Sequence, residues 1–177
     1  MKRWTVNFSG ALLCALLLGY AYYLQFVQHL EPCPLCIFQR VALLVLGCVL
    51  LLAALHHPRT SAGARSYAVL IALCALAGIG VAARHIYIQS LPPGSVPSCG
   101  ATLEYMFEVF PATEVIRKVL TGSGECATVD WSFLGFSMPW WVLLWFVVLG
   151  TTGFIANWTA SPGEPRLPRR RLEPTIR

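Results

Sequence analysis

The chain has 177 residues, of which 56% are apolar and only 12% are charged. A typical soluble domain is roughly 45–50% apolar and about 25% charged, so this composition argues against both a water-soluble globule and a disordered chain. The net charge of +5 would suit a nucleic-acid partner, but the basic residues are placed as in a membrane protein, and we expect no nucleic acid to be bound.

Four charge-poor stretches predict four transmembrane helices, because about 20 apolar residues in a helix cross a bilayer core of about 30 Å. The expected spans are residues 6–27, 34–55, 66–88 and 139–157. The first span begins like a signal peptide, but it is long and ends in aromatic residues without a clear cleavage site, so we expect it to be retained. The second is long enough only if it starts near Pro34, which places Arg40 inside the helix. The prediction is an all-α membrane protein, a four-helix bundle formed by residues 1–158.

The orientation follows from the basic residues near the span ends, which favour the cytoplasmic side. They precede the first span, separate the second from the third and follow the fourth: Lys2, Arg3, Arg59, Arg65, Arg166, Arg169, Arg170, Arg171 and Arg177. Both termini should therefore be cytoplasmic, and the loop 89–138 should face outward. We interpret residues 159–177 as a Pro/Arg-rich cytoplasmic tail that orients the protein, rather than as a specific lipid or partner site.

The outer loop 89–138 contains two short amphipathic patterns that predict helices. The apolar positions are Leu103, Met106, Phe107 and Phe110 in the first, and Val115, Ile116, Val119 and Leu120 in the second. Such helices either lie in the membrane interface or pack on the bundle as a lid, and the sequence does not choose between the two.

The seven cysteines form two groups. Those inside the spans should pack as small apolar residues: Cys14, Cys48 and Cys74. The others all fall on the outer side, where disulfides persist: Cys33, Cys36, Cys99 and Cys126. Four cysteines permit three pairings, and this choice stays open. A zinc site of four cysteines is disfavoured, because structural zinc usually uses two close pairs and the last two cysteines are far apart, so we expect no metal.

Cys33 and Cys36 form a C-x-x-C unit at the outer end of the second span. Pro34 suits the first position of a helix, so Cys36 falls in the first turn, where the helix N-terminus favours a thiolate. Arg40 lies on the same helix face, four residues after Cys36. An arginine at the edge of a span is a candidate functional residue, and the alternative is a side chain that only anchors the helix end.

Cys99 and Cys126 have Gly- and Ser-rich flanks, which suggests that a disulfide between them would be reachable by the thiol of another protein. The alternative is a structural staple for the loop. The neighbouring C-x-x-C unit favours a relay of two exchanging pairs.

The combined pattern resembles the bacterial disulfide bond formation protein B (DsbB) family. The resemblance rests on Glu-Pro-Cys-Pro-Leu-Cys-Ile-Phe-Gln-Arg at residues 31–40, the four spans and the second cysteine pair. It extends to Gly-Ser-Gly-Glu-Cys-Ala at residues 122–127, Trp-Ser-Phe-Leu-Gly at 131–135 and Met-Pro-Trp at 138–140. It covers residues 4–158 and not the tail.

The resemblance implies an inner-membrane thiol:quinone oxidoreductase. It would reoxidise a periplasmic, DsbA-like thioredoxin-fold oxidase and pass the electrons to ubiquinone or menaquinone. The resemblance also implies a role for each cysteine. The partner thiolate attacks Cys99, Cys126 is its resolving mate, Cys33 exchanges with that pair and Cys36 lies next to the quinone. Two further residues are implied near the quinone: Arg40 and His85.

Three other classes of protein compete with this interpretation. One is a structural tetraspan protein whose outer disulfides are inert. Another is a relative that delivers electrons outward, which would need paired thiols within the bilayer. The third is an enzyme similar to vitamin K epoxide reductase.

Overall fold

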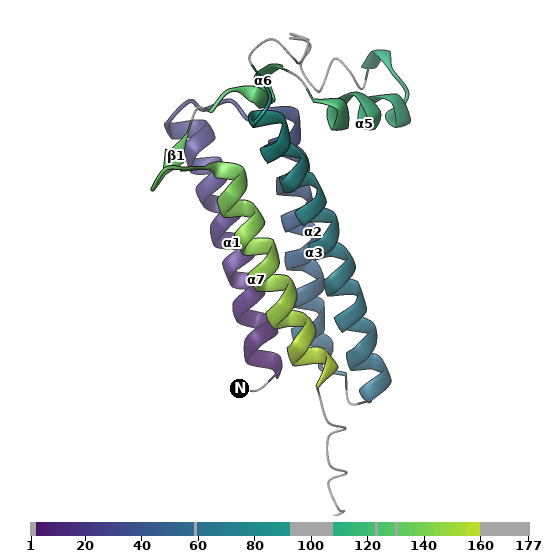
Figure 1. Ribbon diagram of the computed structural model, residues 1–177. Helices are drawn as coiled ribbons and strands as arrows, with labels where there is room; N and C mark the ends of the chain where they lie inside the picture. The colour runs from purple at the N-terminus through teal and green to yellow at the C-terminus, as the bar shows by residue number, and fades with distance from the viewer. Residues whose placement is uncertain (1–2, 59, 93–107, 123, 130, 160–177) are drawn as a thin grey trace, which may run out of the picture.

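The computed structural model describes residues 3–58, 60–92, 108–122, 124–129 and 131–159. Its main elements are four long helices: α1 (Arg3–Val27), α2 (Pro34–His56), α3 (Ser61–Gln89) and α7 (Met138–Trp158). Each is long and apolar enough to cross a membrane, which confirms the expected four-span bundle (Figure 1). Cys99, most of the first amphipathic pattern and the tail from residue 160 lie outside the described residues.

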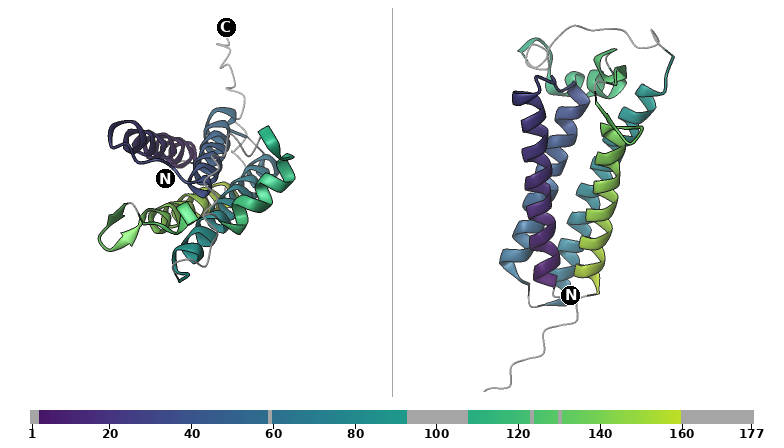
Figure 2. Two further views of the ribbon diagram at one scale, coloured as in Figure 1. Left: turned by 90° about the horizontal axis from the view of Figure 1, so that it is seen from above. Right: turned by 90° about the vertical axis from the view of Figure 1, so that its left-hand side faces the viewer.

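The four helices form a ring in which α1 packs on α2, α2 on α3, α3 on α7 and α7 on α1. The start of α1 and the end of α7 lie at one end of the bundle, and the shorter elements lie at the other end (Figures 1 and 2). This arrangement places residues 28–33 and the described part of 89–137 together, although they are far apart in the sequence.

Capping interactions set where α2 and α3 begin. Cys33 is the N-cap of α2, and Pro34 occupies its first turn, where a missing N–H is not costly. Thr60 caps α3 by accepting a hydrogen bond from the N–H of Gly63, so α3 begins before the expected residue 66. Arg65 therefore lies in this helix rather than in a loop, with its guanidinium 5.6 Å from the ring centroid of Trp158.

Close contacts hold the middle of the bundle together. Gly78 of α3 lies against Phe146 of α7, so that a Cβ at this position would be 2.3 Å from a ring carbon. Near the end of the bundle where α1 begins and α7 ends, Asn7 and Asn157 are fully buried and exchange two side-chain hydrogen bonds of 3.2 and 2.9 Å. A buried amide pair of this kind fixes the register of α1 against α7, because any other register leaves polar atoms without partners.

The second amphipathic pattern forms a lid over the end of the bundle that is opposite the start of α1 and the end of α7. Helix α5 (Ala112–Thr121) buries Val115 and Val119 in a cluster with Leu35 of α2 and Ile88 of α3. Gly122, at φ +96°, then turns the chain into α6 (Gly124–Ala127). The described part of the loop thus favours a lid packed on the bundle.

A two-stranded hairpin joins the lid to α7, and no sequence pattern had indicated it. Strand β1 (Ser132–Phe133) pairs antiparallel with β2 (Phe136–Ser137). The two turn residues, Leu134 and Gly135, both have positive φ, which is the requirement of a two-residue hairpin turn.

Candidate functional site

The first turn of α2 holds the two cysteines of the C-x-x-C unit side by side. The Sγ atoms of Cys33 and Cys36 are 2.9 Å apart, whereas the bond in a disulfide is about 2.05 Å long. The two cysteines are therefore free thiols in this structure. Cys33 donates a hydrogen bond to Cys36, and the N–H of Cys36 in turn lies 3.3 Å from the sulfur of Cys33. The capping geometry of α2 therefore also sets the geometry of the redox pair.

His85 of α3 reaches the same cluster. It is 2% exposed, and its Nε2 lies 3.8 Å from the Sγ of Cys33. Its Nδ1 lies 3.2 Å from the side-chain nitrogen of Gln39, which is also buried. Since the Gln39 amide nitrogen is only a donor, this orientation leaves Nδ1 as the acceptor and the proton on Nε2, directed at Cys33.

Cys126, from α6 in the lid, completes the cluster. It is buried at 1% exposure, and its thiol acts on Cys33 in the direction that lowers the pKa of Cys33. The lid cluster described above includes both residues. The structure thus brings together three of the four expected cysteines, Cys33, Cys36 and Cys126, and the expected His85; the fourth cysteine, Cys99, is not among the described residues.

The surroundings of Cys33 keep its thiol protonated. The hydrogen bond with Cys126 lowers its pKa, but the hydrogen bond with Cys36, burial and the charge of Cys36 outweigh that effect and raise the pKa from 9.0 to about 12. Cys33 is therefore the hydrogen-bond donor of the pair at neutral pH, and Cys36 is the acceptor that this donor stabilises as a thiolate.

Arg40 is fixed by α1 rather than left to extend toward water. Its guanidinium donates to the side-chain oxygen of Gln25 and, over 3.1 Å, to the carbonyl of Ala21. It also lies 5.3 Å from the ring centroid of Tyr22, within the range of a cation–π interaction. These contacts orient the charge beside the cavity described next, which a simple anchoring role would not require.

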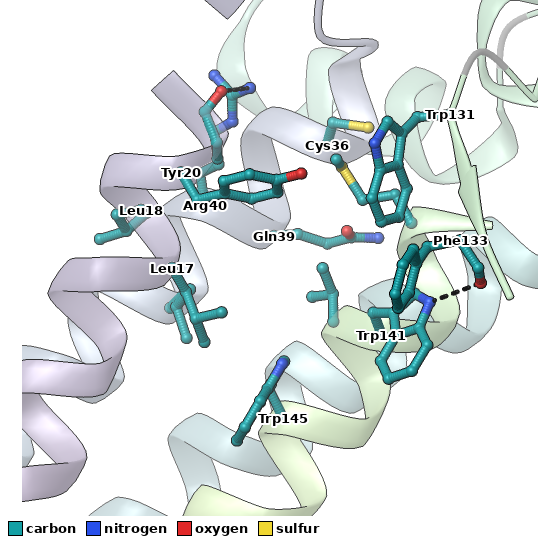
Figure 3. Close-up of a pocket in the computed structure, with 14 residues that line it drawn as sticks. Leu17, Leu18, Tyr20, Cys36, Gln39, Arg40, Trp131, Phe133, Trp141 and Trp145 are labelled. Carbon is teal, nitrogen blue, oxygen red and sulfur yellow. Dashed lines mark hydrogen bonds between the residues drawn. The ribbon is translucent and has the colours of Figure 1, made fainter. Parts of the chain in front are cut away.

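An apolar cavity of about 320 Å³ opens beside Cys36, between α1, α2, the hairpin and α7 (Figure 3). Its walls are mostly aliphatic and aromatic, and its polar side chains include Gln39 and Arg40. The lining residues are Leu17, Leu18, Tyr20, Ala21, Cys36, Gln39, Arg40, Leu43, Trp131, Phe133, Met138, Trp141, Val142 and Trp145. A smaller cavity of about 70 Å³ shares Cys36 and Arg40 with it and extends to Cys33 and His85.

Sequence reasoning had missed Gln39 and the aromatic wall. Gln39 stands three residues after Cys36, a spacing that puts both on one helix face, so its position was readable. The aromatic wall depends on the hairpin, where the indole N–H of Trp141 donates to the carbonyl of Phe133 over 3.3 Å. The signal available for it was the Phe-Leu-Gly-Phe sequence at residues 133–136, which supplies a turn glycine between aromatic residues.

These features define a class of protein: a multi-pass membrane thiol oxidoreductase, with a buried dithiol between a lid cysteine and an apolar cavity. A family model described as disulfide bond formation protein DsbB matches residues 2–156, and the chain belongs to this family. A disulfide bond formation protein B of Nitrosococcus oceani is 53% identical over 148 residues, covering 84% of this chain and 86% of that protein.

Further relatives agree with this result. The disulfide bond formation protein B of Methylococcus capsulatus is 49% identical over 152 residues, covering 86% of this chain and 92% of that protein. The corresponding protein of Hahella chejuensis is 48% identical over 162 residues, with coverages of 89% and 94%.

Family membership confirms the expected enzyme class. The chain is a thiol:quinone oxidoreductase of periplasmic disulfide formation, whose family couples the oxidation of DsbA to the reduction of a quinone. It is a multi-pass membrane protein, and its homologues are inner-membrane proteins. This result excludes the inert tetraspan protein, and it selects the DsbB-type enzyme over the two other redox classes.

Proposed function

We propose that two electrons travel from a DsbA-like dithiol through Cys99 and Cys126 to Cys33 and Cys36, and from Cys36 into the apolar cavity. The observation that carries the proposal is the different environment of the two α2 sulfurs. Cys33 packs in one buried cluster with Cys126 of the lid, whereas Cys36 lines the cavity with Arg40.

The first exchange takes place in the lid. A thiolate of the partner attacks the Sγ of Cys99 in a Cys99–Cys126 disulfide, and Cys126 leaves as a thiolate. The second thiol of the partner, after losing its proton, attacks the partner sulfur of the mixed disulfide. Cys99 is released, the partner is left with a disulfide, and both lid cysteines are now reduced.

The second exchange takes place between the lid and α2. The Cys126 thiolate attacks the Sγ of Cys33 in a Cys33–Cys36 disulfide, and Cys36 leaves as a thiolate. Cys99 then attacks Cys126, which restores the lid disulfide and releases Cys33, which takes up a proton. The hydrogen bond that Cys33 donates to Cys36, together with the α2 N-terminus, stabilises Cys36 as the leaving group.

The cavity residues fit a quinone ring. A volume of about 320 Å³ with apolar walls is of the size of small-molecule sites, about 300–1,000 Å³. Arg40 offers a charged donor for a carbonyl oxygen, and the aromatic wall provides faces for the ring. A bound quinone would accept two electrons from the reduced pair, one proton from Cys33 and one proton from water, so that the Cys33–Cys36 disulfide is restored. Ubiquinone and menaquinone are both compatible with this cavity.

The proposed topology places the lid in the periplasm and both termini in the cytoplasm. Support comes from the helix arrangement, because α1 begins and α7 ends at the end of the bundle opposite the lid. In the sequence, nine of the thirteen basic residues lie at the start of α1, between the end of α2 and the first turns of α3, or after α7, as the positive-inside rule requires. The sequence after α7, residues 159–177, carries five of these basic residues.

The central experiment is the Cys36→Ser variant, assayed for quinone reduction by a reduced DsbA-like protein in purified membranes. We expect quinone reduction to be lost while the partner still exchanges with Cys99. The matched control is Cys74→Ser, because Cys74 is a cysteine of α3 that packs against the bundle core away from the cluster. Undiminished quinone reduction by Cys36→Ser would contradict the proposed path.

A further inference from the structure

The redox cluster also has the donor atoms of a metal site. The thiols of Cys33 and Cys36 and a ring nitrogen of His85 all lie within 4.8 Å of one another. Sequence reasoning disfavoured a site of four cysteines because Cys99 and Cys126 are far apart along the chain. The structure supplies a different donor set, in which a histidine from α3 joins the close pair.

We propose that the fully reduced protein binds one Zn²⁺ ion through Cys33, Cys36, His85 and Cys126. Zinc favours four ligands in a tetrahedron, and three cysteines with one histidine are a common set. Cys126 is the fourth donor because it is buried in the same side-chain cluster as Cys33. The four residues come from three parts of the fold that pack on one another: α2, α3 and the lid.

The distances among Cys33, Cys36 and His85 require little rearrangement, whereas Cys126 is not among the donor atoms that lie within 4.8 Å of one another and must move toward them. Zn–S bonds of about 2.3 Å and Zn–N bonds of about 2.0 Å at tetrahedral angles separate two sulfurs by about 3.7 Å and a sulfur from a nitrogen by about 3.5 Å. The structure has 2.9 Å between Cys33 and Cys36 and 3.8 Å between Cys33 and His85. Small rotations of the two cysteine side chains are enough to open the sulfur pair.

Gln39 provides the outer support that a histidine ligand needs. When Nε2 of His85 binds the metal, the proton moves to Nδ1, which then needs an acceptor. Rotating the Gln39 amide by about 180° places its oxygen where the nitrogen now lies, 3.2 Å from Nδ1. The same contact therefore serves the metal-free and the metal-bound forms.

Binding depends on the redox state. A Cys33–Cys36 disulfide has no thiolates to offer, so the oxidised protein lacks two of the four ligands. In the reduced protein the cysteine thiols bound to the metal release their protons to water, and no electron is transferred. When the Cys36 thiolate is bound to zinc, it cannot pass electrons to a quinone in the cavity, so zinc inhibits quinone reduction. This inhibitory effect rests on the proposed function, whereas the binding itself does not.

The test uses the reduced full-length protein, anaerobic and in detergent, with Co²⁺ as a spectroscopic probe and Zn²⁺ as its competitor. We expect one equivalent of Co²⁺, visible bands of a tetrahedral site, sulfur-to-cobalt charge-transfer bands and displacement by Zn²⁺. The oxidised protein should lack these bands, a comparison that needs no substitution. Cys48→Ser, an outward-facing cysteine of α2, is the matched control and should bind like the parent protein.

Two variants locate the site. Cys36→Ser should abolish the tetrahedral spectrum, and His85→Ala should weaken Zn²⁺ binding by about tenfold or more and shift the visible bands. Equal binding by oxidised and reduced protein, or a His85→Ala spectrum identical to the parent, would overturn the proposal. Metal-free quinone reduction is measured on the same preparations. Normal activity without metal binding refutes the zinc site alone, and metal binding without activity refutes the proposed function alone.

Discussion

Replacing Arg40 with alanine tests the division of the enzyme into a lid side and a cavity side. Arg40 donates to Gln25 and to the carbonyl of Ala21 and lies over Tyr22, so its charge is held at the cavity wall. All three of these contacts are made to α1 and none to the lid. Arg40→Ala should therefore weaken the use of quinone and leave exchange with the partner protein intact.

The expected size follows from the contact that is lost. A hydrogen bond from a charged donor contributes about 1.5–3 kcal/mol, and about 1.4 kcal/mol corresponds to a factor of ten. The apparent KM for quinone should therefore rise about tenfold to a hundredfold in Arg40→Ala. Gln25→Ala removes one hydrogen bond that orients Arg40 but keeps the guanidinium, so it should raise KM less than Arg40→Ala does.

The assay separates the two half-reactions. Quinone reduction is followed by absorbance at saturating reduced partner, with a soluble short-chain quinone varied over the range of KM. Partner exchange is followed separately, by trapping the mixed disulfide with Cys99 in the absence of quinone. Equal losses in both half-reactions for Arg40→Ala would refute the reasoning. So would an unchanged KM in that variant.

Three other predictions concern packing and protonation. Asn157→Ala leaves the buried amide of Asn7 without its partner and should destabilise the protein by about 1–3 kcal/mol in detergent unfolding, whereas an apolar double variant should recover most of the loss. Gly78→Ala places a Cβ against an aromatic ring and should cost about 1–3 kcal/mol in the same assay; Gly80→Ala, which meets open space, is the control and should lose nothing. The raised pKa of Cys33 means that unfolding releases its proton, so the stability of the reduced protein should fall as pH rises from 9 toward 12. Thermal unfolding across this window should show a smaller fall in Cys33→Ser, and an equal fall would contradict the assignment.

The helices were predictable because they depend on local composition. Each expected span agrees with a helix to within a few residues, and the largest difference, at the start of α3, comes from the cap at Thr60. The place of the C-x-x-C unit at a helix start was also predictable, because proline is favoured at the first position of a helix. These features need no knowledge of what packs against them.

The rest of the site depends on contacts between distant segments. His85 became a neighbour of Cys33 only through the packing of α3 on α2, and Cys126 only through the lid. The aromatic wall required the hairpin, whose strands have two residues each and carry almost no periodic signal. The sequence could name His85 by resemblance, but it could not show that Gln39 holds it.

The helical periodicity of α2 explains why Cys33 faces the lid and Cys36 faces the cavity. Four residues of α2 line the cavity: Cys36, Gln39, Arg40 and Leu43. They are spaced three, one and three residues apart, which places them on one face of the helix. Cys33 precedes these residues as the N-cap, where the backbone is extended, and it lies against the lid and α3 instead. A C-x-x-C unit across a helix start thus gives one sulfur to each side while keeping them 2.9 Å apart. One inserted residue between Cys36 and Arg40 would rotate the arginine by about 100° around the helix axis. The guanidinium would then point away from the cavity and from the sulfur of Cys36.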